Sequence, residues 1–155
     1  MKAWKMVDLE HAEAVAKGSM LIGVLAGYMQ AETQRTGKPD GVTTAPGWAY
    51  CLSEVGSEFR PQSGVPQAIF EISDVGLLGQ FAMTRTGARV YDTLYDVVRY
   101  DPAAASAGDA FVKDPMFAAE KEIRLVFRPP QGGQTDGPIL IRADYTIAGL
   151  MKRIA

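Results

Sequence analysis

The segment Phe111–Arg128 constrains the fold of this 155-residue chain more than any other stretch. Its second half alternates apolar and charged residues, which is the pattern of a strand with one buried face. Successive side chains of a strand point to opposite sides, so Ile123, Leu125 and Phe127 are predicted to pack on a core. The other side of the strand carries the charged residues, and it must then meet water, a partner or a ligand.

The charged side consists of Glu120, Glu122 and Arg124, provided that strand pairing begins as early as Glu120. Side chains two residues apart along a strand are separated by about 6–7 Å. One interpretation is a surface strand, in which Arg124 neutralises one of two weakly repelling carboxylates. The other is a strand that lines a cleft, in which the Glu-x-Glu pair does chemistry. The pattern by itself leaves both interpretations open.

Length and composition predict a single domain over residues 1–155. Hydrophobic residues make up 47% of the chain and charged residues 22%, which is the balance of an ordinary soluble globular protein. A chain of this length can bury a sizeable core. Its net charge of −2 argues against broad nucleic-acid binding, which normally requires a basic surface.

The cysteine and histidine content limits the compartment and the metal chemistry. Cys51 is the single cysteine of the sequence, so no intramolecular disulfide can form and a cytoplasmic location is expected. The N-terminal residues lack the pattern of a signal peptide, and no apolar run approaches the ~20 residues of a membrane span. With one histidine and one cysteine, a Cys/His zinc site cannot be built, and we expect no metal cofactor.

Short strands interleaved with helices are predicted for the whole chain. Alternating or apolar runs predict strands at residues 2–7, 19–25, 48–53, 67–72, 93–100, 120–128 and 139–145. Helical spacing predicts helices at residues 9–17, 26–34, 74–81, 103–113 and 147–154, with a short helical turn starting at Asp114. Loops are predicted at residues 36–47 and 54–66, and a hairpin turn at residues 129–137.

This order of elements predicts an α+β fold, a single domain with a mixed, bent β-sheet and flanking helices. Asp8, Thr146 and either Ser73 or Asp74 are the predicted helix N-caps, and Gly18 is a predicted helix stop. The residues predicted to form the core are Leu52, Ile69, Ile72, Val97, Ile123, Leu125 and Phe127.

Four further residues could suggest a function, and we assign them to structure. His11 is expected to be solvated in the first turn of a helix. Cys51 is expected to act as a small buried apolar residue, not as a nucleophile, because no histidine lies near it in sequence. Trp4 and Trp48 lie on predicted strands and are expected in the core.

Three segments together resemble a set of uncharacterised bacterial and phage proteins. They are DLEHAEAVAKGSMLIG at residues 8–23, WAYCLS at residues 48–53 and FVKDPMFAAEKEIRLVF at residues 111–127. The Glu-x-Glu-x-Arg part of the third segment is the most specific. The layout of that set is in turn similar to the ADP-ribosyltransferase fold.

The resemblance implies a site and a cofactor. Enzymes of the ADP-ribosyltransferase fold carry an Arg or His on the first strand, a Ser or Tyr on a central strand and a Glu, often in a Glu-x-Glu pair, on a late strand. The matching residues here would be Lys5, Ser53, Glu120 and Glu122, of which Lys5 departs from the pattern because it lacks the fork of an arginine. NAD is the implied cofactor, and a bacterial protein or nucleic acid is the implied target of an active or degenerate domain.

The resemblance also implies a role for each of these residues. Glu122 would be the catalytic carboxylate, which stabilises the oxocarbenium character that develops when the bond between nicotinamide and ribose breaks. Glu120 would orient the nucleophile of the target, and Arg124 would set the geometry of the carboxylate. Ser53 would position the ribose of the cofactor, and Lys5 would hold a phosphate or the ribose.

Two other classes of function stay open from the sequence. The first is a non-catalytic phage or mobile-element protein that binds and inhibits a bacterial defence complex, as anti-CRISPR proteins do. Such a protein needs a protein partner, and the loops at residues 36–47 and 54–66 would be its candidate contact surfaces. The second is a nucleic-acid binder that uses Arg85, Arg89 and Arg99, although the sequence contains no recognition motif.

Overall fold

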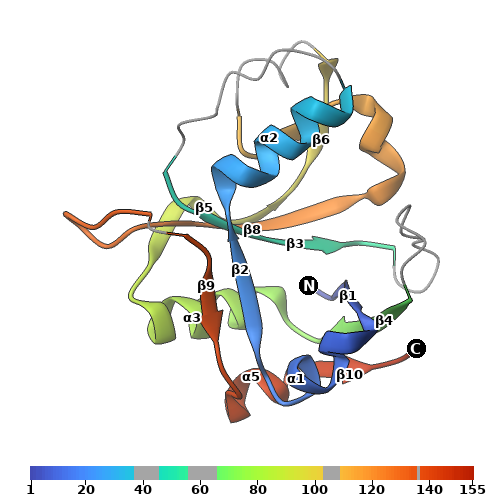
Figure 1. Ribbon diagram of the computed structural model, residues 1–155, viewed down its shortest axis with the longest axis vertical. Coiled ribbons are helices and arrows are strands. Elements are labelled where there is room, and N and C mark those ends of the chain that lie inside the picture. The colour runs from blue at the N-terminus through green and yellow to red at the C-terminus, as the bar shows by residue number, and fades with distance from the viewer. Residues whose placement is uncertain (37–45, 56–65, 103–108, 136) are drawn as a thin grey trace.

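An antiparallel sheet organises the molecule (Figure 1). The computed structural model describes residues 1–36, 46–55, 66–102, 109–135 and 137–155. Within these ranges an eight-stranded sheet contains every strand except β6 and β7. The strands are β1 (Ala3–Asp8), β2 (Met20–Val24), β3 (Trp48–Ser53), β4 (Gln67–Ile72), β5 (Arg89–Val97), β6 (Arg99–Tyr100), β7 (Val112–Lys113), β8 (Glu122–Arg128), β9 (Ile139–Ile141) and β10 (Met151–Arg153).

Strand β3 is the point at which this sheet divides. One path runs in the order β10-β4-β1-β3-β2-β9. Strand β8 lies outside this path and pairs with the whole of β3 on one edge and with β5 on its other edge. At its start β3 pairs with β2, through Ala49 and Trp48, whereas at its end Ser53 pairs with Trp4 of β1. Strands β1 and β2 therefore share different ends of β3 and diverge from it, which leaves space between them.

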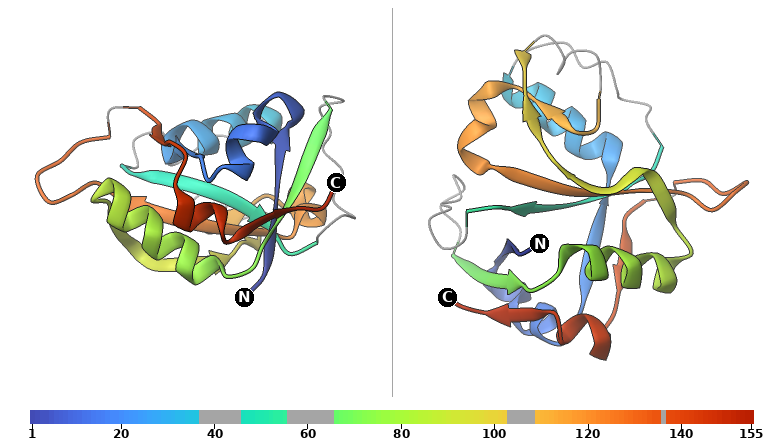
Figure 2. Two further views of the ribbon diagram at one scale, coloured as in Figure 1. Left: turned by 90° about the horizontal axis from the view of Figure 1, so that it is seen from below. Right: turned by 180° about the vertical axis from the view of Figure 1, so that it is seen from behind.

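Helices cover both faces of the sheet. They are η1 (Leu9–His11), α1 (Ala12–Ala16), α2 (Leu25–Thr36), α3 (Val75–Thr86), η2 (Pro115–Glu120) and α5 (Tyr145–Ala148), where η denotes a 3-10 helix. Helices α2 and α3 lie on opposite sides of the sheet (Figure 2). Within the described ranges, no helix combines the length and the apolar character needed to cross a bilayer.

Strand alternation sorts the side chains of β3 and β8 into two cores. The larger core contains Ile123, Leu125 and Phe127 of β8, together with alternate residues of β3 such as Tyr50, and α3 packs against it. The smaller core lies on the other face, under α2, and it includes Leu25, Met29, Ala49, Phe111 and Val126. Because Glu122–Phe127 are buried on both faces of β8, Glu122 and Arg124 cannot reach open water as a surface strand would allow.

The structure confirms most predicted strands and several helix ends. Residues 48–53 and 67–72 form strands with the expected bounds. Asp74 caps α3 by accepting a hydrogen bond from the Leu77 amide at 3.1 Å, and Gly18 follows α1 with φ +89°. Asp114 likewise caps η2 by accepting a hydrogen bond from the Met116 amide.

The prediction for the C-terminal part was wrong in three respects. Residues 129–137 do not form a hairpin turn, because β9 pairs with β2 and not with β8. The predicted helix at residues 147–154 is the short helix α5 followed by β10, which pairs with β4. Asp144, not Thr146, caps α5 by accepting a hydrogen bond from the Ile147 amide at 2.9 Å. Pairing with distant strands overrides the local pattern in each segment.

The other differences have local causes. The predicted helix at residues 103–113 ends in strand β7, and its residues 103–108 lie outside the described part of the chain. The main sheet is antiparallel, not mixed; the parallel pair β6–β7 is separate from it. Val97, predicted to be core, is 38% exposed at the end of β5 although it lies opposite the buried Ile123, and the next residue, Val98, is buried instead. Trp48 is buried as predicted and Trp4 only partly so.

Gly18 is the position where the backbone demands glycine most strongly. A Cβ built on Gly18 would lie 1.9 Å from the carbonyl oxygen of Asp144, and its φ of +89° disfavours other residues. We expect Gly18→Ala to lower the free energy of unfolding by about 2 kcal/mol or more. The measurement is urea unfolding followed by circular dichroism.

Gly27 of α2 provides the matched control, because a Cβ there would meet nothing within 4 Å. Alanine is the better helix former, so Gly27→Ala should raise the free energy of unfolding by about 0.5–1 kcal/mol. Equal effects of the two substitutions would contradict the packing of the turn after α1 against α5.

Candidate functional site

The charged side of β8 is covered by the protein itself, contrary to the expectation that it meets water, a partner or a ligand. Arg124 is fully buried and Glu122 is 6% exposed. On the neighbouring strand, Cys51 lies opposite Arg124 and Ser53 lies opposite Glu122. Segments from α2, β7 and η2 complete the enclosure and supply the partners that a buried charge requires.

Arg124 is the centre of this buried network. Its Nε donates a hydrogen bond to Glu122 and its Nη2 donates to Glu32 of α2. Its Nη1 donates to the carbonyl oxygen of Ala110 at 2.8 Å. The guanidinium therefore joins β8 to α2 and to the segment that leads into β7, and each of its three nitrogens has an acceptor.

Lys113 of β7 is the second buried cation. Its Nζ lies 2.6 Å from Glu122 Oε1, 3.1 Å from Glu120 Oε1 and 3.5 Å from Glu32 Oε1. The same ammonium stands 4.6 Å from the ring centroid of Phe117, a cation–π contact. We name Glu32, Lys113, Glu120, Glu122 and Arg124 the ionic cluster.

Glu32 and Lys113 are members of this cluster that our sequence reasoning missed. Glu32 could have been found, because it stands seven residues after Leu25 and three after Met29, the two buried residues of α2. Those spacings place a carboxylate on the apolar face of a helix, which requires a cationic partner inside the protein. Lys113 carried no comparable signal, because its strand β7 has only two residues and forms through a distant pairing.

Glu120 belongs to the cluster for a reason other than strand parity. Strand β8 begins at Glu122, whereas Glu120 ends η2 and is followed by Lys121 in a left-handed conformation with φ 42°. The hydroxyl of Ser53 donates a hydrogen bond to the Glu120 carbonyl oxygen at 2.7 Å and so fixes this turn. The carboxylates of Glu120 and Glu122 both contact Lys113, although only Glu122 lies on β8.

Opposite charges control the protonation of the buried groups. Burial alone would raise the pKa of Glu122, but Arg124 and Lys113 hold that pKa below its ordinary value, so the carboxylate is an anion at neutral pH. Burial raises the pKa of Glu32 in spite of the same two cations. Desolvation would lower the pKa values of Arg124 and Lys113, but Glu122 and Glu32 together raise both of them above their ordinary values.

A cavity of about 190 Å³ lies beside the cluster. Lys5, Ser53, Glu120 and Glu122, which the sequence singled out together, all line it, although they come from β1, β3, η2 and β8. Arg124 does not line this cavity and reaches it only through Glu122. The other lining residues are Trp4, Met6, Cys51, Leu52 and Gln67.

Lys5 and Cys51 lie together on one wall. Lys5 Nζ donates a hydrogen bond to the Cys51 carbonyl oxygen at 2.8 Å and lies 4.4 Å from the ring centroid of Tyr50. Burial lowers the pKa of Lys5. Burial also raises the pKa of the Cys51 thiol to about 12, so the thiol is protonated at neutral pH and is a poor nucleophile, in agreement with the structural role expected for it.

A larger cavity of about 700 Å³ adjoins the first, because Lys5, Met6 and Gln67 line both. It occupies the space between the diverging strands β1 and β2, and its walls include Leu21 of β2 and Leu140 of β9. The lining also includes the aromatic residues Tyr28, Tyr50 and His11 and the charged residues Asp8 and Arg142. The two cavities together offer an apolar, aromatic compartment next to a carboxylate.

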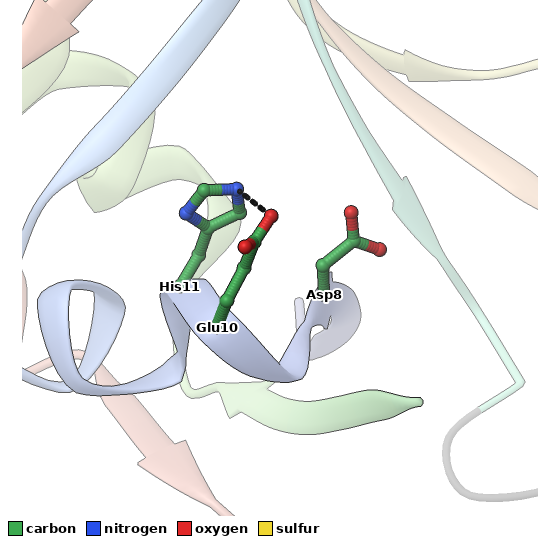
Figure 3. A group of neighbouring side chains, drawn as sticks. All are labelled: Asp8, Glu10 and His11. Carbon is green, nitrogen blue, oxygen red and sulfur yellow. Dashed lines mark ion pairs between the residues drawn. The ribbon is translucent and has the colours of Figure 1, made fainter. Parts of the chain in front are cut away.

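His11 stands near two carboxylates at the rim of the larger cavity (Figure 3). The ligand atoms of Asp8, Glu10 and His11 lie within 4.8 Å of one another, and all three side chains are accessible to solvent. Glu10 Oε1 lies 3.3 Å from His11 Nε2, and Asp8 accepts a hydrogen bond from Gln67 at 2.6 Å.

The other residues singled out from the sequence are dispersed. Arg85 pairs with Asp144 at the end of α3, and Arg99 pairs with Asp109 at 3.4 Å. Most of the two loops expected to contact a partner, residues 37–45 and 56–65, lies outside the described residues.

Comparison with protein-family models, with curated proteins and with solved structures finds no match for this chain. The resemblance described above therefore rests on the sequence motifs alone.

Removing Arg124 should test the ionic cluster directly. Arg124→Ala leaves Glu122 and Glu32 with less compensation in a buried place, so it should lower the free energy of unfolding by about 3–5 kcal/mol. Arg99→Ala is the matched control, because Arg99 is 71% exposed and pairs with Asp109 in water. That variant should change the stability by at most about 1 kcal/mol, as measured by urea unfolding. Similar losses for both variants would contradict the burial of Arg124.

The two buried glutamates should give stability opposite dependences on pH. The lowered pKa of Glu122 means that its contribution is complete above its ordinary value of 4.5 and is lost as the pH falls through the lowered value. The raised pKa of Glu32 means that its contribution is complete below 4.5 and is lost as the pH rises through the raised value.

Unfolding measured across about pH 3–7 should separate these two effects. Glu122→Gln should flatten the acidic side of the stability profile, and Glu32→Gln should flatten the side above pH 4.5. Glu54→Gln, at an exposed position directly after β3, serves as the control for a lost carboxylate. If the two buried variants changed the same side of the profile, the assignment of the shifts would be wrong.

Proposed function

We propose that this protein is an ADP-ribosyltransferase-like domain that acts with NAD on a bacterial protein or nucleic-acid target. One observation carries the proposal. Lys5, Ser53, Glu120 and Glu122, matched to that fold from sequence motifs, line a single cavity. Their strands support it further, because β1 and β8 both pair with the central strand β3.

The state of Glu122 suits the chemistry of such a reaction. NAD, when bound, supplies an ADP-ribosyl group through its bond to nicotinamide, and breaking that bond develops positive charge on the ribose. A carboxylate stabilises this charge best if it is ionised and already fixed in place. Arg124 and Lys113 hold Glu122 ionised, and their hydrogen bonds restrict its rotation.

The two adjoining cavities suit a dinucleotide. The larger cavity, of about 700 Å³, lies within the range of about 300–1,000 Å³ that small-molecule sites occupy, and the smaller one adds about 190 Å³ beside it. Tyr28 and Tyr50 offer apolar surface for flat rings, and Arg142 and Lys5 offer cationic groups for a diphosphate. Asp8 on the same wall would repel a phosphate, so the anionic part belongs nearer to Arg142 than to Asp8.

Ser53, Glu120 and Arg124 would have separate roles, toward the ribose of the cofactor, the nucleophile of the target and Glu122 in turn. The Ser53 hydroxyl donates its proton to the Glu120 carbonyl oxygen, so toward a ligand it can serve only as an acceptor. The Glu120 side chain is 30% exposed at the same cavity, where it can accept a hydrogen bond from an incoming nucleophile. Arg124 acts on the reaction through Glu122 and is a positioning residue.

One observation favours a second function. Both carboxylate oxygens of Glu122 already accept hydrogen bonds from cations of the chain, as they would in a cluster that serves folding alone. The alternative is therefore a non-catalytic phage or mobile-element protein that inhibits a bacterial defence complex. In that case the cavity is incidental and a protein partner carries the function.

Release of nicotinamide from NAD is the decisive measurement, with bacterial lysate as the source of target. We expect Glu122→Gln to lower the rate at least about 100-fold, since it removes the charge that stabilises the ribose. Circular dichroism must first show that this variant is folded, because Glu122 is part of the ionic cluster. Lys5→Ala should chiefly weaken the binding of NAD, seen as a smaller rise in Tm at saturating NAD.

Glu13→Gln, on the exposed face of α1, should keep the full rate. If the wild-type protein releases no nicotinamide and NAD does not change its Tm, the enzymatic proposal is wrong. The alternative then requires that expression of the chain protect a phage from a CRISPR-carrying host, and that Glu122→Gln protect it equally well.

A further inference from the structure

A second groove lies at the opposite end of β8 from Glu122. It has a volume of about 390 Å³ and is lined by Arg89 and Tyr91 of β5, Arg128 of β8, and the turn that follows β8. At about 3.3 Å per residue, the length of β8 separates this groove from the Glu122 cavity by about 20 Å. The two sites share no lining residue.

Two arginines lie side by side in this groove, on the neighbouring strands β5 and β8. Arg89 and Arg128 are directly opposite partners in the antiparallel pair β5–β8, so their Cα atoms lie about 4.5–5.5 Å apart. Like charges at such positions are unfavourable unless something compensates them. Their side chains are also held in place, because Arg89 Nε donates to the Pro129 carbonyl oxygen at 3.0 Å and the Arg128 guanidinium lies 4.8 Å from the Tyr91 ring centroid.

This pair lacks the acidic partner that several other arginines of the chain have. Within the described residues, no carboxylate lies within ion-pair distance of Arg89 or Arg128, whereas Arg85, Arg99 and Arg124 each pair with an acid. Arg142 and Arg153 also have no acid partner among the described residues, but Arg89 and Arg128 are directly opposite partners on neighbouring strands, so their two positive charges act at one place. The unbalanced charge suits an anion supplied from outside.

We propose that this groove binds a phosphomonoester carried on a flat ring, as in a mononucleotide. Paired guanidinium groups bind phosphate oxygens in a forked geometry, and two positive charges favour a dianion over a carboxylate. The groove is far larger than a phosphate group, and Pro46, Pro129 and Pro130 give it apolar walls. A flat base can pack against these rings and against the plane of Arg128, which Tyr91 supports from its other side. This site does not depend on the proposed function.

Calorimetric titration with adenosine monophosphate at low salt tests the site. Arg89→Ala and Arg128→Ala should each weaken binding about tenfold or more, because each removes a charge-assisted contact. Arg128→Lys keeps the charge but loses the fork, so it should show an intermediate loss. Arg153→Ala, an equal change of charge on the exposed strand β10, should bind as the wild type does.

Three further arms identify the ligand and the place of binding. Adenosine without phosphate should bind at least about tenfold more weakly than the monophosphate. Binding of a 5′-phosphorylated decathymidylate, but not of the unphosphorylated strand, would extend the site to nucleic-acid ends. Glu122→Gln should not change the affinity for the monophosphate. The proposal is wrong if the double variant Arg89→Ala/Arg128→Ala binds as tightly as the wild type, or if Glu122→Gln abolishes binding while the arginine variants do not.

Discussion

The burial of the Arg124 guanidinium is the constraint on which the rest of the structure depends. A charged group without access to water is tolerated only if its own partners replace the water, and here Glu122, Glu32 and the Ala110 carbonyl do so. Those partners come from β8, α2 and the segment before β7. The position of the helix on one face of the sheet is therefore tied to the position of the short strand that supplies Lys113. Loss of any one partner would leave the remaining buried charges with fewer opposite charges and hydrogen bonds to stabilise them.

The same ion pairs that hold the fold together also prepare the carboxylate at the cavity wall. Glu122 turns its two oxygens to Arg124 and Lys113, remains ionised, and still borders the cavity that Lys5 and Ser53 share. The space for this cavity and for its larger neighbour comes from the division of the sheet at β3, where β1 and β2 leave in different directions. A structural network and a preorganised carboxylate thus coincide, which is why catalytic and purely structural interpretations of Glu122 require activity measurements to separate them.

Local pattern was sufficient wherever one strand or one cap decided the outcome. Strands β3 and β4 have the bounds that alternation predicted. Asp74 begins α3 and Gly18 follows the end of α1, as capping rules require. Local pattern did not predict the pairing of β9 and β10, because these strands pair with β2 and β4, which are distant in sequence. It also failed for Val97, which is exposed at the end of β5 although it lies opposite Ile123, because alternation does not show which end of a strand the core covers.

The sequence by itself determined the α+β class and the central strands, because short-range periodicity carries that information. The group Lys5, Ser53, Glu120 and Glu122 came from a resemblance of sequence motifs, and the structure shows only that the four residues line one cavity. It did not determine that the charged side of β8 is enclosed. Period-2 alternation separates two faces but cannot say what covers each of them. Only the tertiary structure placed Glu32 against Arg124, from 92 residues away, and Lys113 against Glu122, from 9 residues away, because burial of a charge depends on partners that no local pattern connects.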